Sequence, residues 1–281
     1  NSSSYLFSQI SPNHPFPPPS FSPNHLIILP GHAIYLGDQS NHQNLFNSSN
    51  WVLEPYQEIN SNNSIATFLN HIQIANQLAQ NDQNSLLIYS GGQTRSKSNQ
   101  LTEATSYLRL AQQLNLHLLL NHKSLQMTTE DYALDSWTNL IYSIARFNEY
   151  TGQYPQKITI VGHAVKASRF INIHRKALRW PKEKFNYIGL DPIIHSKSSN
   201  KINLLHQSNQ ISQGEKKVYL NFEIDLYGCH GELLEKRKNR NPFRRFHPYR
   251  DSCPEIKGLL DWCPINGIDP YPAQLPWSNL I

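Results

Sequence analysis

The sequence predicts an α/β fold, in which a Rossmann-like, mostly parallel sheet carries helices on both faces. From Leu26 onward, short apolar runs alternate with longer stretches whose apolar residues recur at helical spacing. This alternation is typical of parallel strands joined by crossover helices. In addition, 38% of the 281 residues are apolar, which is enough for one sizeable core, and no repeat of solenoid or propeller length is present.

Five strands are expected, each a short apolar run followed by glycine, proline or polar residues: 26–29, 86–89, 116–120, 158–161 and 185–190. Three helices are expected between them, with apolar faces across 65–78, 104–114 and 133–144. We interpret these faces as ordinary core packing. Polar, irregular insertions are expected at 34–64 and 193–212. The C-terminal extension, 214–281, is expected to form helices and a basic run that cap one edge of the sheet.

The N-terminal residues 1–24 are rich in serine and proline, which favours an extended stalk or linker. The remainder, 25–281, is expected to be a single domain. The chain does not begin with methionine, and its only methionine is Met127. We therefore expect a processed or truncated product whose missing N-terminus carried a signal or an anchor. No apolar run approaches the roughly 18 residues that a membrane-spanning helix needs.

Sequons and cysteines both fit a secretory protein. Three N-x-S sequons are present, at Asn1, Asn47 and Asn62. They lie in Ser/Asn-rich stretches that suit glycosylated loops, although chance sequons are expected in such a composition. Cys253 and Cys263 are ten residues apart, close enough for one disulfide that leaves Cys229 free, with three reduced thiols as the alternative. No Cys-x-x-Cys pair is present, which argues against a structural zinc site.

Two histidines follow expected strands at the same rim of the sheet. Ligands of open α/β sheets bind outside the carboxyl ends of the strands. His32 and His163 each lie in a Gly-His-Ala triplet directly after an expected strand. An imidazole at this place can act as acid or base or bind a metal, whereas a single histidine is more often structural. Two histidines at one rim favour a functional role.

The segment SGGQTR follows the strand 86–89 and is a candidate anion site. Its candidate phosphate ligands are Ser90, Gly91, Gly92, Gln93 and Arg95. Two glycines let backbone N–H groups turn toward an anion at a helix N-terminus. A tight strand-to-helix turn is the alternative. The segment is neither a Walker loop nor GxGxxG, so it supports neither nucleoside triphosphate hydrolysis nor a standard dinucleotide site.

Acidic residues at the same end of the sheet are candidate ligands of a cation or of sugar hydroxyls. Glu130 precedes Asp135, Ser136 and Asn139 at helical spacing, and Glu103 lies near the start of the helix after SGGQTR. Helix capping is the alternative for the acids in this stretch.

Basic residues form two further candidate sites. Lys166 and Arg169 lie in the first two turns of the helix expected after 158–161. We expect this pair to bind a diphosphate, with a solvated helix face as the alternative. The run 236–250 holds seven cations interleaved with aromatic residues and accounts for the net charge of +5. Nucleic-acid grooves and surfaces that face anionic lipids both have this composition. Because the sequons and the leader favour the secretory route, we expect a lipid-facing or phosphate-facing role, with a solvated edge as the alternative.

Taken together, the motifs LIILPGHA, LLIYSGGQTR, EDYALDSWTN and ITIVGHAVKASRF resemble the YdcF/SanA/ElyC-like family, across about residues 25–265. WVLEPYQ and SCPEIKGLLDWC resemble its fungal branch. The positions that match the family are Gly31, Ser90, Gly91, Gly92, Glu103, Glu130, Ser136, Asn139, His163 and Arg169. His32 departs from the bacterial pattern, so its role is not carried over from bacterial members.

The resemblance implies a Rossmann-like domain of a single-pass membrane protein that faces the periplasm or a secretory lumen. Bacterial relatives act in cell-envelope construction around polyprenyl-phosphate carriers. The fungal branch is linked to a pyrophosphatase that acts on dolichol-linked oligosaccharides. For this chain the resemblance implies a type II membrane protein of the Golgi or the endoplasmic reticulum. Its partners are then a phosphorylated lipid-linked glycan and a membrane, without nucleic acid.

We therefore expect a metal-assisted hydrolase that cleaves the diphosphate bond of a lipid-linked oligosaccharide. The expected catalytic residues are His163, Glu130, Glu103 and His32. The expected ligands of a divalent cation (Mn, Co or Mg) are Glu103, Glu130 and Asp135. The expected phosphate and substrate contacts are Ser90, Gly91, Gly92, Gln93, Arg95, Lys166, Arg169, Ser136 and Asn139.

Two other functions remain open at this point. A nucleotide-binding or S-adenosylmethionine-binding protein, either a methyltransferase or a sensor, is the main alternative. Against it, the strand 86–89 ends in Tyr89-Ser90 without the acidic residue that holds a ribose hydroxyl. The third possibility is an interaction domain without catalysis, in which the rim residues do not cluster.

Overall fold

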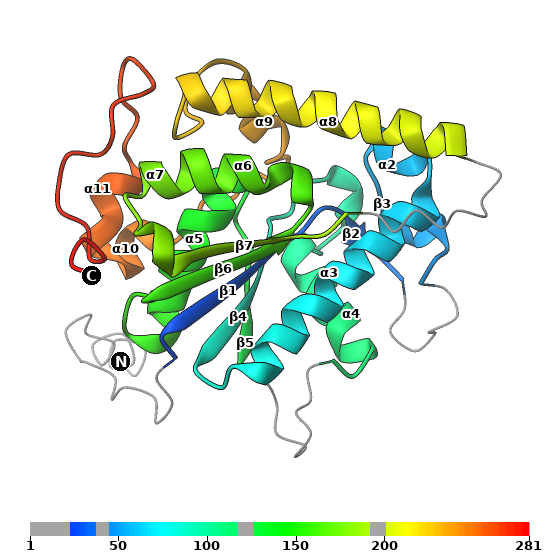
Figure 1. The fold of residues 1–281 in the computed structure, drawn as a ribbon, viewed down its shortest axis with the longest axis horizontal. Helices are drawn as coiled ribbons and strands as arrows, with labels where there is room; N and C mark the ends of the chain where they lie inside the picture. The colour runs from blue at the N-terminus through cyan, green and yellow to red at the C-terminus, as the bar shows by residue number, and fades with distance from the viewer. Residues whose placement is uncertain (1–22, 38–44, 117–125, 192–200, 281) are drawn as a thin grey trace, which may run out of the picture.

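Five parallel strands form the central sheet, with helices on both faces (Figure 1). The computed structural model describes residues 23–37, 45–116, 126–191 and 201–280. The strands are β1 (His25–Pro30), β4 (Ser85–Ser90), β5 (Met127–Glu130), β6 (Lys157–Gly162) and β7 (Phe185–Gly189). Their spatial order is β5-β4-β1-β6-β7, and all neighbours are parallel. The predicted Rossmann-like α/β fold is confirmed.

The strand order changes direction at β1. The two strands that follow β1 in this sheet lie on one side of it, and the last two lie on the other. The carboxyl ends of β1 and β6 are therefore the topological switch point, where α/β sheets bind their ligands.

Four of the five predicted strands are confirmed. The fifth, 116–120, lies almost entirely outside the described residues. The strand next to β4 is instead β5. It lies in residues 127–139, which were expected to open a helix. β5 lies at the edge of the sheet, and its sequence MTTE is polar and half-exposed, so it lacks the apolar run of a central strand.

Alternate residues of each central strand pack on opposite faces of the sheet. Ile27 and Leu29 contact the face covered by α3 (Ser61–Asn81) and α4 (Glu103–Gln113). Leu26 and Ile28 face α5 (Ser136–Thr151) and the helical segment at 164–177. The three predicted helices are thus confirmed as α3, α4 and α5.

The segment at 164–177 is a continuous helical stretch that includes α6 (Ala167–Arg169), a π-helical turn (Phe170–His174) and α7 (Arg175–Ala177). Such turns insert one extra residue and are frequent at functional sites. The segment begins directly after His163 at the carboxyl end of β6.

Two segments expected to be irregular contain regular structure. β2 (Ile34–Tyr35) and β3 (Trp51–Val52) form a small antiparallel ribbon, followed by α2 (Pro55–Glu58). The long helix α8 (Lys201–Ile224) starts inside the expected insertion and runs past α6, α9 and α2 (Figure 1).

The C-terminal extension covers a helical layer and not an edge of the sheet. It contains α9 (Gly231–Asn239), α10 (Tyr249–Ser252) and α11 (Lys257–Leu260). Its buried residues, among them Tyr249 and Trp277, join the core cluster of α5 and Trp180. The expected contact with the sheet edge is limited to Tyr249, which bonds Glu130 of the edge strand β5, and the other apolar residues of the extension pack mainly against helices.

The disulfide joins Cys229 to Cys263, so the predicted Cys253–Cys263 pair is wrong. Cys253 is fully buried against α5, where its thiol donates to the carbonyl oxygen of Ala145 at 3.3 Å. The Cα atoms of Cys229 and Cys263 lie 5.9 Å apart, within the usual range for a disulfide. Proximity in sequence was misleading because α11 separates Cys253 from Cys263.

Of the three sequons, Asn47 and Asn62 lie exposed on the surface, and Asn1 is outside the described residues. Asn47 begins a short helical turn, in which its Oδ1 accepts hydrogen bonds from the backbone N–H and the hydroxyl of Ser49. Among the described residues, none of the helices is both long enough and apolar enough to cross a membrane.

Loss of the Cys229–Cys263 bond is expected to lower the free energy of unfolding by about 3–4 kcal/mol, because its loop spans 34 residues. Denaturant unfolding of Cys229→Ser, compared with oxidised wild-type protein, measures this loss, and reduced wild-type protein should resemble the variant. Cys253→Ala is the control and retains the disulfide. A disulfide-linked peptide containing Cys253, found by non-reducing peptide mapping, contradicts the assignment.

Candidate functional site

A cavity of about 360 Å³ lies at the carboxyl ends of the strands. Its walls include Gly31 and His32 after β1, Gly162 at the end of β6, and residues that follow β4. Helices α8 and α9 supply the outer wall through apolar residues such as Phe222 and Leu233. The cavity therefore lies at the switch point of the sheet.

Five cationic side chains line this cavity, from the loop after β4, the segment after β6, and α9: Arg95, Lys166, Arg169, Lys236 and Arg240. The three arginines pair with carboxylates, and the two lysines form no ion pair with any described carboxylate. Two lysines that face a common cavity make it suitable for a polyanion.

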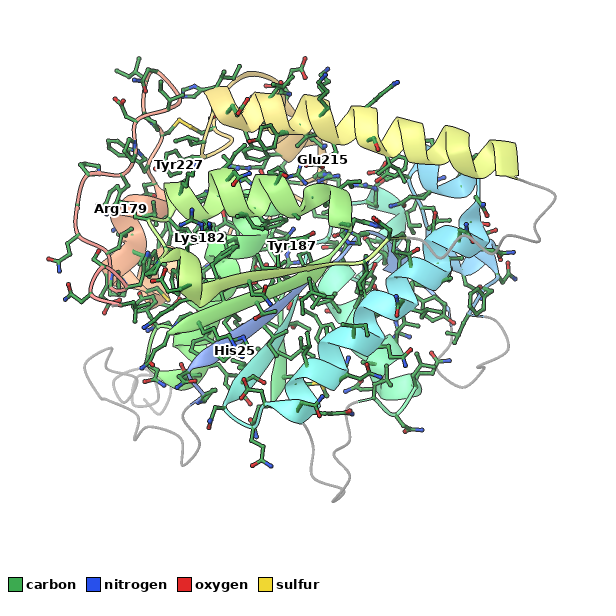
Figure 2. The ribbon with its side chains drawn as sticks, viewed as in Figure 1. His25, Arg179, Lys182, Tyr187, Glu215 and Tyr227 are labelled. Atoms are coloured by element: carbon green, nitrogen blue, oxygen red, sulfur yellow. A yellow bond between two sulfur atoms is a disulfide. The ribbon has the colours of Figure 1, made fainter. Side chains whose placement is uncertain are left out.

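Ion pairs fix the three arginines in place. Arg95 and Arg240 both contact Glu54. Arg169 lies 3.2 Å from Glu215, which projects from α8 (Figure 2), so this pair joins α8 to α6. Arg169 is 5% exposed, and its Nε is buried without a hydrogen-bond partner among the described residues.

Lys166 is the most perturbed cation of the cavity. Burial, together with the charge of Arg169, lowers the pKa of its ammonium group to about 7. Its Nζ lies 3.2 Å from Nδ1 of His32. A bound anion would stabilise the charged form, so Lys166 is poised to take up a proton when an anion binds.

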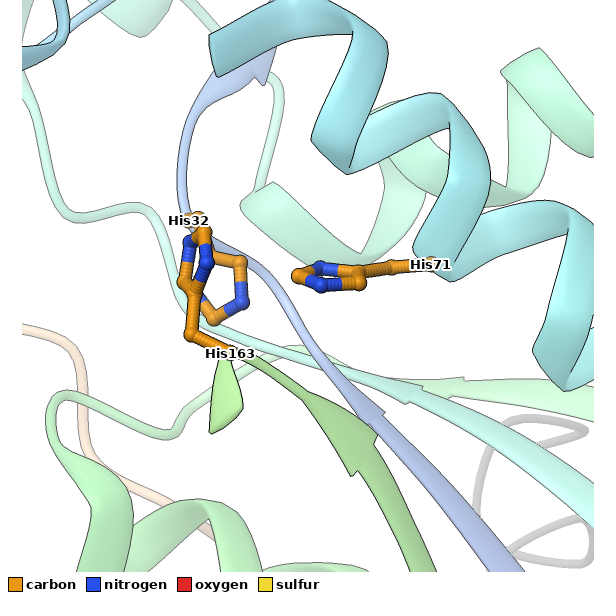
Figure 3. Close-up of side chains that lie close together, drawn as sticks. All are labelled: His32, His71 and His163. Carbon is orange, nitrogen blue, oxygen red and sulfur yellow. The ribbon is translucent and has the colours of Figure 1, made fainter. Parts of the chain in front are cut away.

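Three histidine rings meet beside the cavity (Figure 3). His32 follows β1, His163 follows β6, and His71 comes from α3. The ring centroids of His32 and His163 lie 4.5 Å apart, and that of His71 lies 5.4 Å and 4.8 Å from them. One ring nitrogen from each lies within 4.8 Å of the others, so we call these residues the histidine trio.

The pairing of the sheet explains why the trio forms. β1 and β6 are adjacent, so residues that directly follow them are neighbours. His71 lies on the buried face of α3, one turn from Phe68, whose ring packs against His32 and His163. His71 was not predicted as a site residue, because a single polar residue in an apolar helical face is usually structural. The only sign of a role in the sequence is that His71 interrupts that apolar face.

All three histidines are held neutral. Burial lowers the pKa of His71 to about 4 and the pKa values of His32 and His163 well below 6.5, and the charge of Lys166 lowers both further. Nε2 of His71 is 3.4 Å from the carbonyl oxygen of Leu190. If this nitrogen carries the hydrogen, Nδ1 of His71 keeps a free lone pair.

The histidine trio fits a transition-metal ion. Nδ1 of His71 and Nε2 of His32 are buried without a hydrogen-bond partner among the described residues. Neutral imidazoles are ligands of zinc, cobalt and manganese, and an outer hydrogen bond such as that of His71 typically orients them. Ligand nitrogens of a tetrahedral site lie about 3.3 Å apart, so small inward movements of the rings complete the geometry.

Glu103, another predicted acid, lies against Gly31, the residue before His32. It lines the cavity, and its carboxylate accepts a hydrogen bond from Thr94. The side chain packs between Gly31 and Gly91, and a Cβ at Gly91 would come within 2.7 Å of the Glu103 Cβ. Glycine is required at positions 31 and 91, because Glu103 fills the space that a Cβ atom at either position would need.

Glu130 and Asp135, expected as metal ligands, hold the scaffold together. Glu130 is fully buried at the end of β5, where its oxygens accept hydrogen bonds from Ser90, Tyr249 and two backbone N–H groups. Burial raises its pKa to about 7. Asp135 caps α5 and forms a two-point contact with Arg237, at 2.7 and 2.9 Å. Asp135 lines the cavity, but neither carboxylate belongs to the group of ligand atoms that the histidine trio brings within 4.8 Å.

The expected phosphate cradle at Ser90–Gln93 is a tight turn. The backbone N–H groups of Gly91 and Gly92 donate to the carbonyl oxygens of Glu130 and Ala133, at 3.0 and 2.7 Å. The Ser90 hydroxyl is buried against Glu130 and Asn139, and the Gln93 side chain contacts Asn99. The N–H groups of Gly91 and Gly92 and the Ser90 hydroxyl are therefore occupied within the protein. The segment forms the tight strand-to-helix turn that was the alternative to an anion site.

Several other predicted contacts do line the cavity: Arg95, Lys166, Arg169, Ser136 and Asn139. Ser136 hydrogen-bonds Nε2 of His174 at 2.8 Å, and Asn139 accepts a hydrogen bond from Ser90. The basic run at 236–250 contributes Lys236 and Arg240 to the same cavity, so part of it faces the cavity.

We expect the free energy of unfolding to fall as the pH drops from about 6.5 toward about 4, because the buried histidines have lower pKa values when folded and the unfolded chain binds more protons. Each such histidine contributes a slope of about 1.4 kcal/mol per pH unit. Denaturant unfolding in the presence of a chelator measures the slope. His71→Gln should lower the slope by the contribution of one histidine. A slope equal to that of the wild-type protein would contradict the low pKa of buried His71.

No family model and no solved structure matches the chain. The chain is similar to a relative from Saccharomyces cerevisiae (strain ATCC 204508 / S288c), "Uncharacterized protein YOR238W". The two sequences are 33% identical over an alignment of 280 positions, and the alignment covers 84% of this chain and 91% of the yeast protein. This similarity extends over almost the whole yeast protein, and the chain therefore belongs to the family of YOR238W.

Proposed function

We propose that this protein is a metal-dependent hydrolase that cleaves the diphosphate bond of a polyprenol- or dolichol-linked oligosaccharide. The observation that carries the proposal is the position of the histidine trio beside a cavity with five cationic side chains. A metal centre next to an anion site is the arrangement that phosphoryl chemistry needs.

The cationic side chains have distinct roles in this proposal. Lys166 and Lys236 neutralise the phosphate oxygens, since no described carboxylate pairs with them. Arg169 and Arg240 are oriented by Glu215 and Glu54, and they present fixed donors. Apolar residues of the same cavity, such as Phe222, suit the first part of a lipid chain.

Of the three cations expected from the sequence, the trio favours Mn or Co over Mg, because Mg prefers oxygen ligands. The ion would polarise a phosphoryl oxygen and lower the pKa of a bound water. Glu103, whose carboxylate lines the cavity and forms no ion pair among the described residues, accepts the proton of the attacking water.

The proposed setting is the secretory lumen. The Cys229–Cys263 bond and the exposed sequons at Asn47 and Asn62 support it. The N-terminal membrane anchor and the Golgi or endoplasmic reticulum location rest on the resemblance to the YdcF/SanA/ElyC-like family. The S-adenosylmethionine alternative is less well supported, since β4 ends without an acid and the amides of Gly91 and Gly92 are occupied.

Removal of the metal or of its ligands should abolish hydrolysis. The wild-type protein with Mn or Co is expected to release phosphorylated glycan from a lipid-linked oligosaccharide, and a chelator should stop the release. His71→Ala and His163→Ala should each lower turnover by about a hundredfold or more. His25→Gln is the control: His25 is also buried, but it lies at the amino end of β1 and bonds Asp82 and Thr159 (Figure 2). Metal-independent turnover in wild type contradicts the proposal.

Lys166→Ala should weaken binding of inorganic diphosphate by about ten- to a hundredfold, because it removes a buried charge that faces the cavity. Isothermal titration calorimetry measures the loss. Lys182→Ala removes an exposed lysine outside the cavity and is the matched control. Equal affinities of the two variants would show that the cavity is not the anion site.

A further inference from the structure

The surface loop at 241–248 joins α9 to α10 and presents two aromatic rings to solvent. Phe246 is 87% exposed and Phe243 is 43% exposed. In contrast, Tyr249, directly after the loop, is 1% exposed. We call residues 241–248 the Phe loop.

The Phe loop is held in one shape by its own hydrogen bonds. Nδ2 of Asn241 donates to the Arg245 carbonyl at 2.9 Å, and Oδ1 of Asn241 accepts from the Arg245 N–H at 2.8 Å. The Arg244 N–H donates to the Asn241 carbonyl, and Arg244 has a φ of 53°. That conformation is disfavoured outside glycine, so it persists because the surrounding bonds impose it.

Contacts on both sides of Phe246 fasten the loop to the rest of the domain. The Arg245 guanidinium donates to the Asp131 carbonyl at 3.1 Å and lies 4.5 Å above the Tyr132 ring. The His247 ring lies 4.4 Å from that of Tyr142. Because its neighbours are anchored, the exposure of Phe246 belongs to a fixed loop, and binding through it costs little ordering entropy.

The charge beside the two rings is positive. Arg244 lies exposed between Phe243 and Phe246 in the sequence and forms no ion pair with any described carboxylate. Arg250, a few residues on, is also exposed and pairs with Asp261. Exposed aromatic rings next to an unpaired arginine match the interfacial zone of a bilayer, where rings lie among the headgroups and cations meet phosphates.

We propose that the Phe loop docks this protein onto a membrane that contains anionic lipids, with Phe243 and Phe246 in the interfacial zone and Arg244 on headgroup phosphates. The docking is independent of the proposed hydrolase activity. It does place the membrane near the cavity: Arg240, which lines the cavity, immediately precedes the loop, and Arg245 contacts Asp131 just after β5. A lipid-linked substrate would then lie close to the site.

Vesicle flotation with the full 281-residue chain tests the docking. Wild-type protein should float with phosphatidylcholine vesicles that contain phosphatidylserine, and less with phosphatidylcholine alone or at high salt. The double variant Phe243→Ala/Phe246→Ala should lower the partition coefficient by about tenfold or more. Arg244→Gln should remove the preference for phosphatidylserine. Phe46→Ala, which removes a 51% exposed ring outside the loop, should float like wild type.

Failure of the wild-type protein to float with either kind of vesicle would overturn the proposal, and so would equal flotation of the double variant. If the wild-type protein does not float but forms a dimer in analytical ultracentrifugation, and the double variant is a monomer, the two rings serve self-association instead. Thermal unfolding of each variant verifies that these substitutions at surface positions leave the fold intact.

Discussion

The parallel pairing of β1 with β6 determines where the histidine trio and the cavity lie in this protein. β1 also pairs with β4 on its other side. The chain therefore extends the sheet from β1 through β4 and β5 on one side, and through β6 and β7 on the other. His32 and His163 directly follow the paired strands, and their rings meet for that reason. Burial then keeps the imidazoles neutral. The helices after β6 and at the C-terminus add cations around a point that the sheet has already defined.

Much of the fold could be predicted from the sequence because the central strands and the helices bury apolar residues with clear periodicity. β5 could not, since an edge strand with the sequence MTTE has no apolar run. The cysteine pairing also depends on long-range structure: the packing of Cys253 against α5 and the position of Cys229 after α8 decide it. Residues close in sequence are held apart by the helix between them.

The site was harder to predict than the fold, because a polar residue that serves a ligand looks like one that serves the scaffold. Glu130 and Asp135 have the residue type and position of metal ligands, yet they satisfy backbone N–H groups, a hydroxyl and an arginine. Conversely, His71 looks like an ordinary polar interruption of an apolar helix face. Only the packing of α3 on the sheet brings it to His32 and His163.

The position of the histidine trio has a consequence for the order of binding. His71 is fully buried, and of the three histidines His32 is the one that lines the cavity. An ion that enters through the cavity must pass the place where the phosphates would lie. The metal would then load first, the bound anion would trap it, and exchange would require an empty cavity. With the proposed metal in place, such an ordered sequence would make its release slow while an anion occupies the cavity.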